Sequence, residues 1–174
     1  MFRLWKVKDF VRIPPDRFGE PLEVVAREEL KKRYEGKVDS TLGLIIAVLD
    51  IDVNPEGILI QGDGATYHDV LVDLLTYYPI LNEVTLGEVV DVKKIGMYVN
   101  IGPLDAFVHI SQITDDKMVY DELRDLLVGE ETKKVFKRGD VVRGRIVSVS
   151  MNPPTSIKVS MTLRQPYLGK VEAM

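Results

Sequence analysis

The stretch KKIGMYVNIGPLDAFVHISQI, residues 93–113, contains two short runs of alternating apolar residues joined by a Gly-Pro turn. This alternation is typical of β-strands, whose successive side chains point to opposite faces of a sheet. One face of the predicted hairpin suits a protein core, with Met97, Val99, Ile101, Val108 and Ile110. The opposite face carries three rings, those of Tyr98, Phe107 and His109. These rings are therefore either covered by other protein or available to stack on a ligand.

The C-terminal half continues the pattern of short strands with turn residues between them. Five strands are predicted at residues 88–94, 96–102, 106–111, 140–150 and 156–163. Five is the number expected of a small, partly open barrel of the OB type. The acidic segment between the third and fourth strands predicts a short helix.

The N-terminal half has a different, mixed pattern. Residues 2–13 predict a strand that Pro14-Pro15 ends, and residues 21–34 predict an amphipathic helix with Pro21 at its first position and Gly36 as its stop. Residues 42–53 predict a buried strand, and residues 57–61 predict its hairpin partner. Residues 66–78 fit either a helix or a strand, and we favour a strand. We expect an α+β fold, with an N-terminal domain of residues 1–80 and an OB-fold domain of residues 81–174.

Composition excludes several classes of protein. The chain has no cysteine and two histidines, so it offers no disulfide, no thiolate nucleophile and little for a metal, and we expect no cofactor. It has no apolar run of about 18 residues and no secretory signal, which predicts a soluble, cytoplasmic protein without membrane contact. The net charge is −4, but residues 105–131 are strongly acidic and residues 133–170 strongly basic. A local basic surface is compatible with this distribution.

Five blocks in the C-terminal half resemble the RNA-binding OB module named for its repeats in the largest small-subunit ribosomal protein. They are Gly87-x-Val89-Val90, Ile95-Gly96-Met97-Tyr98-Val99, Val108-His109-Ile110-Ser111, Gly139-Asp140-x-Val142 and Ile157-x-Val159-Ser160. Five blocks in the right order are a strong signal, whereas each alone is weak.

Further motifs extend the resemblance over nearly the whole chain. They are Arg12-Ile13-Pro14-Pro15, Tyr34-Glu35-Gly36, Gly62-Asp63-Gly64, Gly102-Pro103-Leu104-Asp105 and Arg164-Gln165-Pro166-Tyr167-Leu168-Gly169-Lys170. Together they are similar to the stalk subunits of archaeal DNA-directed RNA polymerase, called E-prime or subunit seven, and to the seventh subunit of eukaryotic polymerase II. The resemblance implies an RNP-like tip domain that docks on the polymerase core and an OB domain facing nascent single-stranded RNA. It also implies a heterodimer with a small helical RNA polymerase subunit, called F.

The predicted RNA-binding surface joins the three rings with three cations. Stacking on rings serves any base, and Arg143, Arg145 and Lys158 alternate with core residues, so they point outward where they can attract phosphates. Two alternatives remain open: a helix or the small helical partner covers the rings, or the cations form an ordinary solvated face.

The predicted docking site consists of two loops. The resemblance implies that Arg12, Ile13, Pro14 and Pro15, with Gly62, Asp63 and Gly64, form the tip that enters a pocket on the polymerase core. Rigid prolines and compact glycines suit a loop that inserts with little loss of entropy. Gly62 and Gly64 also fit a plain turn, and they lack the lysine and Ser/Thr of a P-loop.

No catalytic motif is found. His68-Asp69 and His109-x-Ser111 lack a third group that orients the base, and paired acids such as Asp115-Asp116 fit a solvated surface better than an active site. We therefore predict a non-catalytic polymerase subunit. The alternatives are a free OB-fold RNA-binding factor in translation or RNA decay, which would have no use for the tip loops, and a nuclease, for which the chain lacks a catalytic domain.

Overall fold

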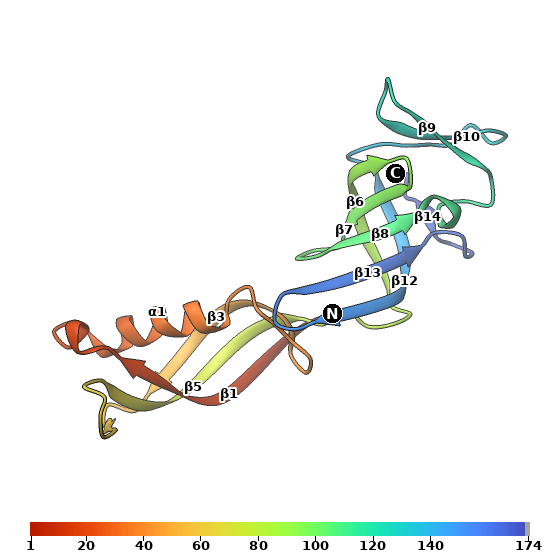
Figure 1. Cartoon of the computed structure of the whole chain (residues 1–174). Helices are drawn as coiled ribbons and strands as arrows, with labels where there is room; N and C mark the ends of the chain where they lie inside the picture. Colours follow the sequence, from red (N-terminus) through yellow and green to blue (C-terminus); the bar gives the residue numbers. More distant parts are fainter. Residues whose placement is uncertain (173–174) are drawn as a thin grey trace. The chain divides into compact units, whose positions relative to one another are not determined.

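The computed structural model in Figure 1 describes residues 1–172, and its contacts divide the chain into two compact units. Unit 1 comprises Met1–Tyr78 together with Asn152–Ser156, and unit 2 comprises Pro79–Met151 together with Ile157–Met174. Each unit has its own sheet system. The predicted domains of residues 1–80 and 81–174 stay a prediction, because contact units alone do not show independent folding.

Unit 1 is an antiparallel sheet with one helix on one face (Figure 1). The strand order is β1-β5-β3-β2, and β4 adds to β5. Residues 66–78, which fitted either helix or strand, form a strand, as favoured. The elements are β1 (Phe2–Ile13), η1 (Pro15–Arg17), α1 (Leu22–Tyr34), β2 (Val38–Asp39), β3 (Gly43–Val53), β4 (Ile58–Leu59) and β5 (Thr66–Tyr77).

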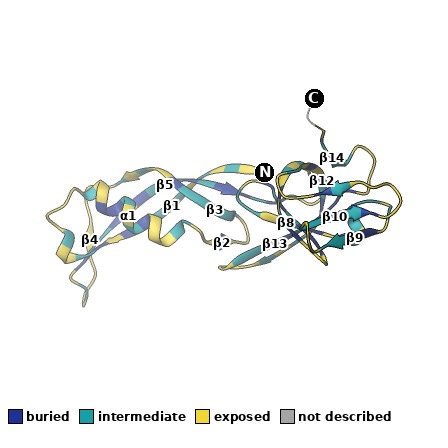
Figure 2. Cartoon of the chain, turned by 90° about the horizontal axis from the view of Figure 1, so that it is seen from above, coloured by how far each residue is buried: buried dark blue, intermediate teal, exposed yellow. Residues whose placement is uncertain are grey.

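The core of unit 1 lies between α1 and the sheet. Val25, Ala26 and Leu30 of the helix pack against alternate residues of the strands, such as Val11 and Val72, which are fully buried. The strand residues between these point away from α1, and Figure 2 shows the resulting alternation of buried and more exposed positions. The predicted helix is confirmed, with Pro21 one position earlier than expected, as the N-cap.

Unit 2 contains the predicted five-stranded barrel. Its strands follow the order β13-β8-β7-β6-β12, and a further pairing between β12 and β13 closes the ring. β14, which was not predicted, pairs with β12. The elements are β6 (Val84–Lys93), β7 (Gly96–Asn100), β8 (Asp105–His109), η2 (Ile110–Gln112), β12 (Val141–Asn152), β13 (Ser156–Thr162) and β14 (Gly169–Lys170). The α+β fold class is confirmed.

The predicted helix in the acidic segment is wrong. The segment forms β9 (Met118–Asp121) and β10 (Leu126–Gly129), which pair in a hairpin and continue to β11 (Val135–Phe136). The carboxylate of Asp121 accepts hydrogen bonds from the backbone N–H groups of Leu123 and Arg124, and Asp125 has a left-handed backbone with φ 55°. These turn features end a helix, so local turn chemistry overrides the helical composition.

The predicted pairing of residues 57–61 with the preceding strand is also wrong. β4 pairs with β5, through Ile58 opposite Tyr67 and Leu59 opposite Thr66. Close packing fixes this arrangement, because a Cβ on Gly57 would lie 2.6 Å from Nε2 of His68. The short strand therefore folds forward onto β5.

Candidate functional site

The three predicted rings lie together on the outer face of the barrel. Tyr98 of β7 stands directly opposite Phe107 of β8, with ring centroids 5.2 Å apart, and the His109 ring lies 6.3 Å from that of Phe107. Neighbouring residues such as Met97 and Val108 are fully buried inside the barrel, so strand alternation turns the rings outward. We call these three residues the ring row.

The ring row is accessible to a ligand. Tyr98 and Phe107 are half-buried and His109 is exposed. Lys93, which was not among the predicted site residues, places its ammonium 5.3 Å from the centre of the Tyr98 ring. The sequence feature that could have identified Lys93 is its position at the end of the strand that pairs with the strand of Tyr98. The helix that could have covered the rings is absent, because that segment is the β9–β10 hairpin.

His109 is held in one tautomer by its own turn. Its Nδ1 accepts a hydrogen bond from the backbone N–H of Ser111 at 3.2 Å and lies 2.8 Å from the Ser111 hydroxyl. Because Nδ1 is the acceptor, Nε2 carries the proton of the neutral ring. The row thus offers two aromatic faces and one N–H donor.

The predicted cations divide into two groups. Lys158 is exposed on β13. It lies two residues before Ser160, and Ser160 pairs with Phe107, so Lys158 lies beside the ring row. Arg143 and Arg145 lie on β12, which β6 separates from the strand of Tyr98. The structure therefore brings Lys158 to the rings but not the two arginines.

The two arginines have different surroundings. Arg145 is half-buried, and its Nε has no hydrogen-bond partner. Arg143 is exposed and donates a hydrogen bond of 3.4 Å to the backbone oxygen of Tyr167, in the C-terminal segment.

The two predicted tip loops meet in unit 1. Arg12, near the end of β1, donates two hydrogen bonds to the carboxylate of Asp63, from Nε at 3.0 Å and from Nη2 at 2.9 Å. The Tyr67 hydroxyl and the backbone N–H of Ala65 also donate to Asp63. A bidentate arginine with two further donors fixes a carboxylate firmly.

Electrostatics agree with this geometry. The hydrogen bond from Arg12, and then that from Tyr67, hold the pKa of Asp63 well below its usual range. The same bond to Asp63 raises the pKa of Tyr67. Asp63 therefore remains a carboxylate, and the two loops stay joined, at any physiological pH.

The other predicted tip residues surround this ion pair. Ile13 is buried in the core of unit 1, whereas Pro14 is half-buried and Pro15 is exposed. Gly62 and Gly64 are exposed; Gly62 has a left-handed φ of 89°, and a Cβ on Gly64 would lie 3.4 Å from Cγ of Pro15. Ile13 therefore anchors the loop, and the remaining residues form its surface.

An apolar run beside the tip was missed as a functional element. Ile58, Leu59 and Ile60 are 66%, 73% and 47% exposed (Figure 2). Successive residues of a strand point to opposite faces, so three consecutive apolar residues cannot all face the protein core. This apolar run was the feature of the sequence that could have revealed the exposed side chains. Large exposed apolar side chains next to one another are typical of a protein contact.

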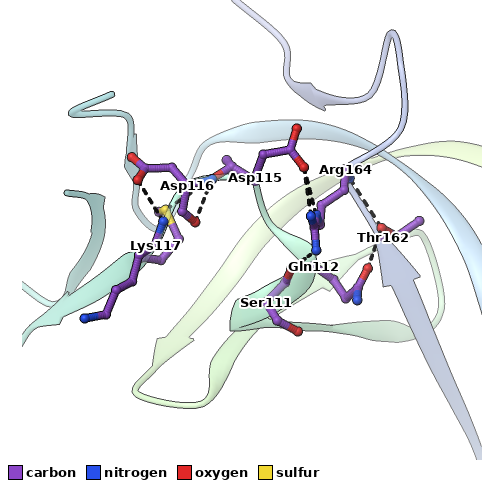
Figure 3. A network of polar contacts seen from close by, with 9 residues as sticks. Ser111, Gln112, Asp115, Asp116, Lys117, Thr162 and Arg164 are labelled. Atoms are coloured by element: carbon purple, nitrogen blue, oxygen red, sulfur yellow. Dashed lines mark hydrogen bonds and ion pairs between the residues drawn. The ribbon is translucent and has the colours of Figure 1, made fainter. Parts of the chain in front are cut away.

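The remaining polar clusters are structural. His68 is buried, with Nδ1 2.8 Å from the backbone oxygen of Asn54 and Nε2 3.0 Å from the Thr66 hydroxyl. Figure 3 shows that Asp115 is bound by Arg164, through two hydrogen bonds of 3.0 and 2.9 Å. Within residues 1–172 no cluster of histidines and acids is suited to a metal ion, and no helix is long and apolar enough to cross a membrane.

Comparisons with known proteins match both units. Residues 8–64 match the family described as "SHS2 domain found in N terminus of Rpb7p/Rpc25p/MJ0397", and residues 78–150 match the "S1 RNA binding domain". The chain is 48% identical over 173 residues to "DNA-directed RNA polymerase subunit Rpo7" of Saccharolobus solfataricus, covering 99% of this chain and 96% of that protein. The Rpo7 of Sulfolobus acidocaldarius is 45% identical over 172 residues, covering 99% and 94%.

A eukaryotic relative is more distant. "DNA-directed RNA polymerase III subunit RPC8" of Bos taurus is 30% identical over 156 residues, covering 86% of this chain and 76% of that protein. The similarity to the archaeal proteins spans both units from end to end. The chain therefore belongs to the Rpo7 family of DNA-directed RNA polymerase subunits.

Proposed function

We propose that this chain is a non-catalytic stalk subunit of DNA-directed RNA polymerase, which docks on the polymerase core through its tip and contacts nascent single-stranded RNA through its ring row. Full-length similarity to Rpo7 proteins supports membership of a polymerase. The non-catalytic role agrees with the surroundings of both histidines, which are engaged in local turns and packing.

The observation that carries the docking proposal is the Arg12–Asp63 ion pair. It joins two loops that are about 50 residues apart in the chain, so the tip surface is preformed before a partner arrives. A preformed loop loses little entropy on binding. The exposed run Ile58–Ile60 beside it supplies apolar area for the contact.

The docking proposal is tested by charge reversal at the tip. Asp63→Arg places a cation against Arg12 and separates the loops, so we expect recovery of core subunits with the tagged chain to fall by about tenfold or more. Asp73→Arg is the control, because Asp73 of β5 pairs with Lys6 of β1 at 3.3 Å, away from the tip. Equal recovery with both variants, or recovery of ribosomes in place of polymerase subunits, would contradict docking through the tip.

The ring row supports the RNA contact. Its aromatic faces stack on any base, and Lys93 and Lys158 attract phosphates without reading sequence. The partner is single-stranded, because stacking requires unpaired bases. In a stalled elongation complex whose nascent RNA carries 4-thiouridine, we expect cross-links to the segment of residues 96–111; cross-links only to other subunits would contradict this contact.

The proposed heterodimer with the small helical polymerase subunit is supported by the face of unit 1 that lies opposite α1. Phe2 and Leu4 of β1 point away from the helix and are 55% and 73% exposed. A partner that covers this face buries apolar area and stabilises the fold. At about 100 times its dissociation constant, the helical partner should add about 2.7 kcal/mol to the stability of the chain. An unchanged melting temperature in that excess would exclude the heterodimer.

A further inference from the structure

The C-terminal segment contains a turn with an unexpected residue. The backbone N–H of Leu168 donates to the oxygen of Gln165 at 3.1 Å, so residues 165–168 form a β-turn. Pro166 occupies its second position, and Tyr167 occupies its third with φ 65°. This is the type II pattern, whose third position favours glycine or asparagine. A tyrosine in this conformation is strained.

Packing does not compensate for the strain. The Tyr167 side chain is 91% exposed, although tyrosine buries large area wherever it contributes to a core. Two hydrogen bonds tie the surrounding backbone to β12: Tyr167 O accepts from Arg143 at 3.4 Å, and Val171 N donates to the oxygen of Val141 at 2.8 Å. A strained turn therefore presents a bare aromatic ring to solvent. Strain of this kind is concentrated at functional sites.

The ring stands at a cleft of about 1000 Å³ within unit 2. Two ion pairs fix the walls, Arg164 with Asp115 at 2.9 Å (Figure 3) and Lys170 with Asp140 at 3.1 Å. These pairs neutralise two of the acids that line the cleft.

Two further cations belong to this region. Lys134 lines the cleft, and Arg143 is bonded to the turn itself. Neither charge is used by the ion pairs in the walls. The region thus combines an exposed aromatic ring with cations whose charges remain available, which is the combination that binds a base and its phosphate.

We propose that this cleft is a second site for single-stranded RNA. A base stacks on the ring of Tyr167, and the cations of Lys134 and Arg143 attract the phosphates. The site rests on the proposed RNA contact and extends it beyond the ring row. It also gives a role to Arg143, which lies on a strand apart from the rings.

The turn offers a variant that removes the ring while relieving the strain. Glycine adopts a positive φ without strain, so Tyr167→Gly should not lower the melting temperature. Its affinity for a uridine oligomer of about 20 nucleotides should fall by about 5-fold to 150-fold, which corresponds to the free energy of stacking one base. Tyr167→Phe keeps the ring and should bind within about twofold of the parent chain. Lys134→Gln should lower the slope of log affinity against log salt by about 0.7.

The full chain, its variants and Tyr98→Ala are compared in one titration. Weakening by both Tyr167→Gly and Tyr98→Ala, with cross-linking of a 4-thiouridine oligomer to residues 165–168, supports two sites. Weakening by Tyr98→Ala alone overturns the second site and leaves the ring row intact. Parent-like binding by both variants, or no binding by the parent at low salt, overturns both RNA contacts. If Tyr167→Gly still binds RNA but no longer binds the helical partner, the ring of Tyr167 serves a protein contact and the second site is overturned.

Discussion

Replacing Tyr98 by alanine tests the ring row directly. The half-buried ring lies against Phe107 on one side and beneath the Lys93 ammonium. A single aromatic ring contributes about 1–3 kcal/mol per stacked base, so Tyr98→Ala should weaken binding of single-stranded RNA by about 5-fold to 150-fold. Because stacking is not an ionic interaction, the loss should be similar at every salt concentration.

The same substitution should leave the barrel folded. Tyr98 points outward, whereas its neighbours Met97 and Val99 are fully buried and fill the core. Removing the contact with Phe107 costs only about 0.5–1.5 kcal/mol beyond the lost area. Tyr98→Phe keeps the aromatic ring and serves as the matched control, with affinity expected within about twofold of the parent.

The assay is fluorescence anisotropy with a labelled uridine oligomer, at salt concentrations from about 50 to 200 mM. Lys158→Ala should reduce the slope of log affinity against log salt by about 0.7, the loss of one phosphate contact on a single strand. The reasoning is refuted if Tyr98→Ala binds RNA like the parent at every salt concentration while circular dichroism shows an intact barrel. The rings would then serve a protein neighbour.

Three further predictions concern stability. Gly87→Ala should lose about 1–3 kcal/mol in thermal unfolding, because its Cβ would lie 2.4 Å from Cγ1 of Val99; an unchanged melting temperature would contradict the close packing. The backbone N–H of Thr132, above all, lowers the pKa of Asp116 below its usual 3.8, so this bond stabilises the fold above pH 3.8 and its contribution is lost as pH falls further. Asp116→Asn should flatten that acid limb of the melting curve. Burial, and then a hydrogen bond to a carboxylate, raise the pKa of Tyr34 to about 12. The contribution of Tyr34 to the stability of the fold is therefore present below pH 10.0 and is lost between pH 10.0 and about 12. Tyr34→Phe should remove this alkaline loss of stability.

Strand alternation accounts for what the sequence could predict. Residues 96–109 read with a period of two, and the structure buries Met97, Val99 and Val108 and turns Tyr98 and His109 outward as expected. The period of a strand is local, so it survives folding without knowledge of the partner strand. The five barrel strands were predictable for the same reason, and α1 was predictable from the 3.6-residue period of a helix, which is equally local.

Two errors arose where a turn decides the structure. Residues 115–131 have the composition of a helix, but the carboxylate of Asp121 organises a tight turn and Asp125 takes a left-handed backbone. The direction of β4 likewise depends on Gly57, which lies against the ring of His68. Such effects come from single side chains meeting across the fold, and averaged propensity does not contain them.

The assignment of Arg143 to the ring row exposes a third limit. Alternation correctly predicted that its side chain points outward, because Val142 and Ile146 on the same strand are buried. Alternation cannot predict which strands become neighbours, since barrel closure sets β6 between β12 and β7. Arg143 on β12 and Tyr98 on β7 therefore lie on strands that are not adjacent. Lys158 therefore belongs with Phe107, and Arg143 belongs with Tyr167, so the variants Lys158→Ala and Arg143→Ala should alter RNA binding through different rings.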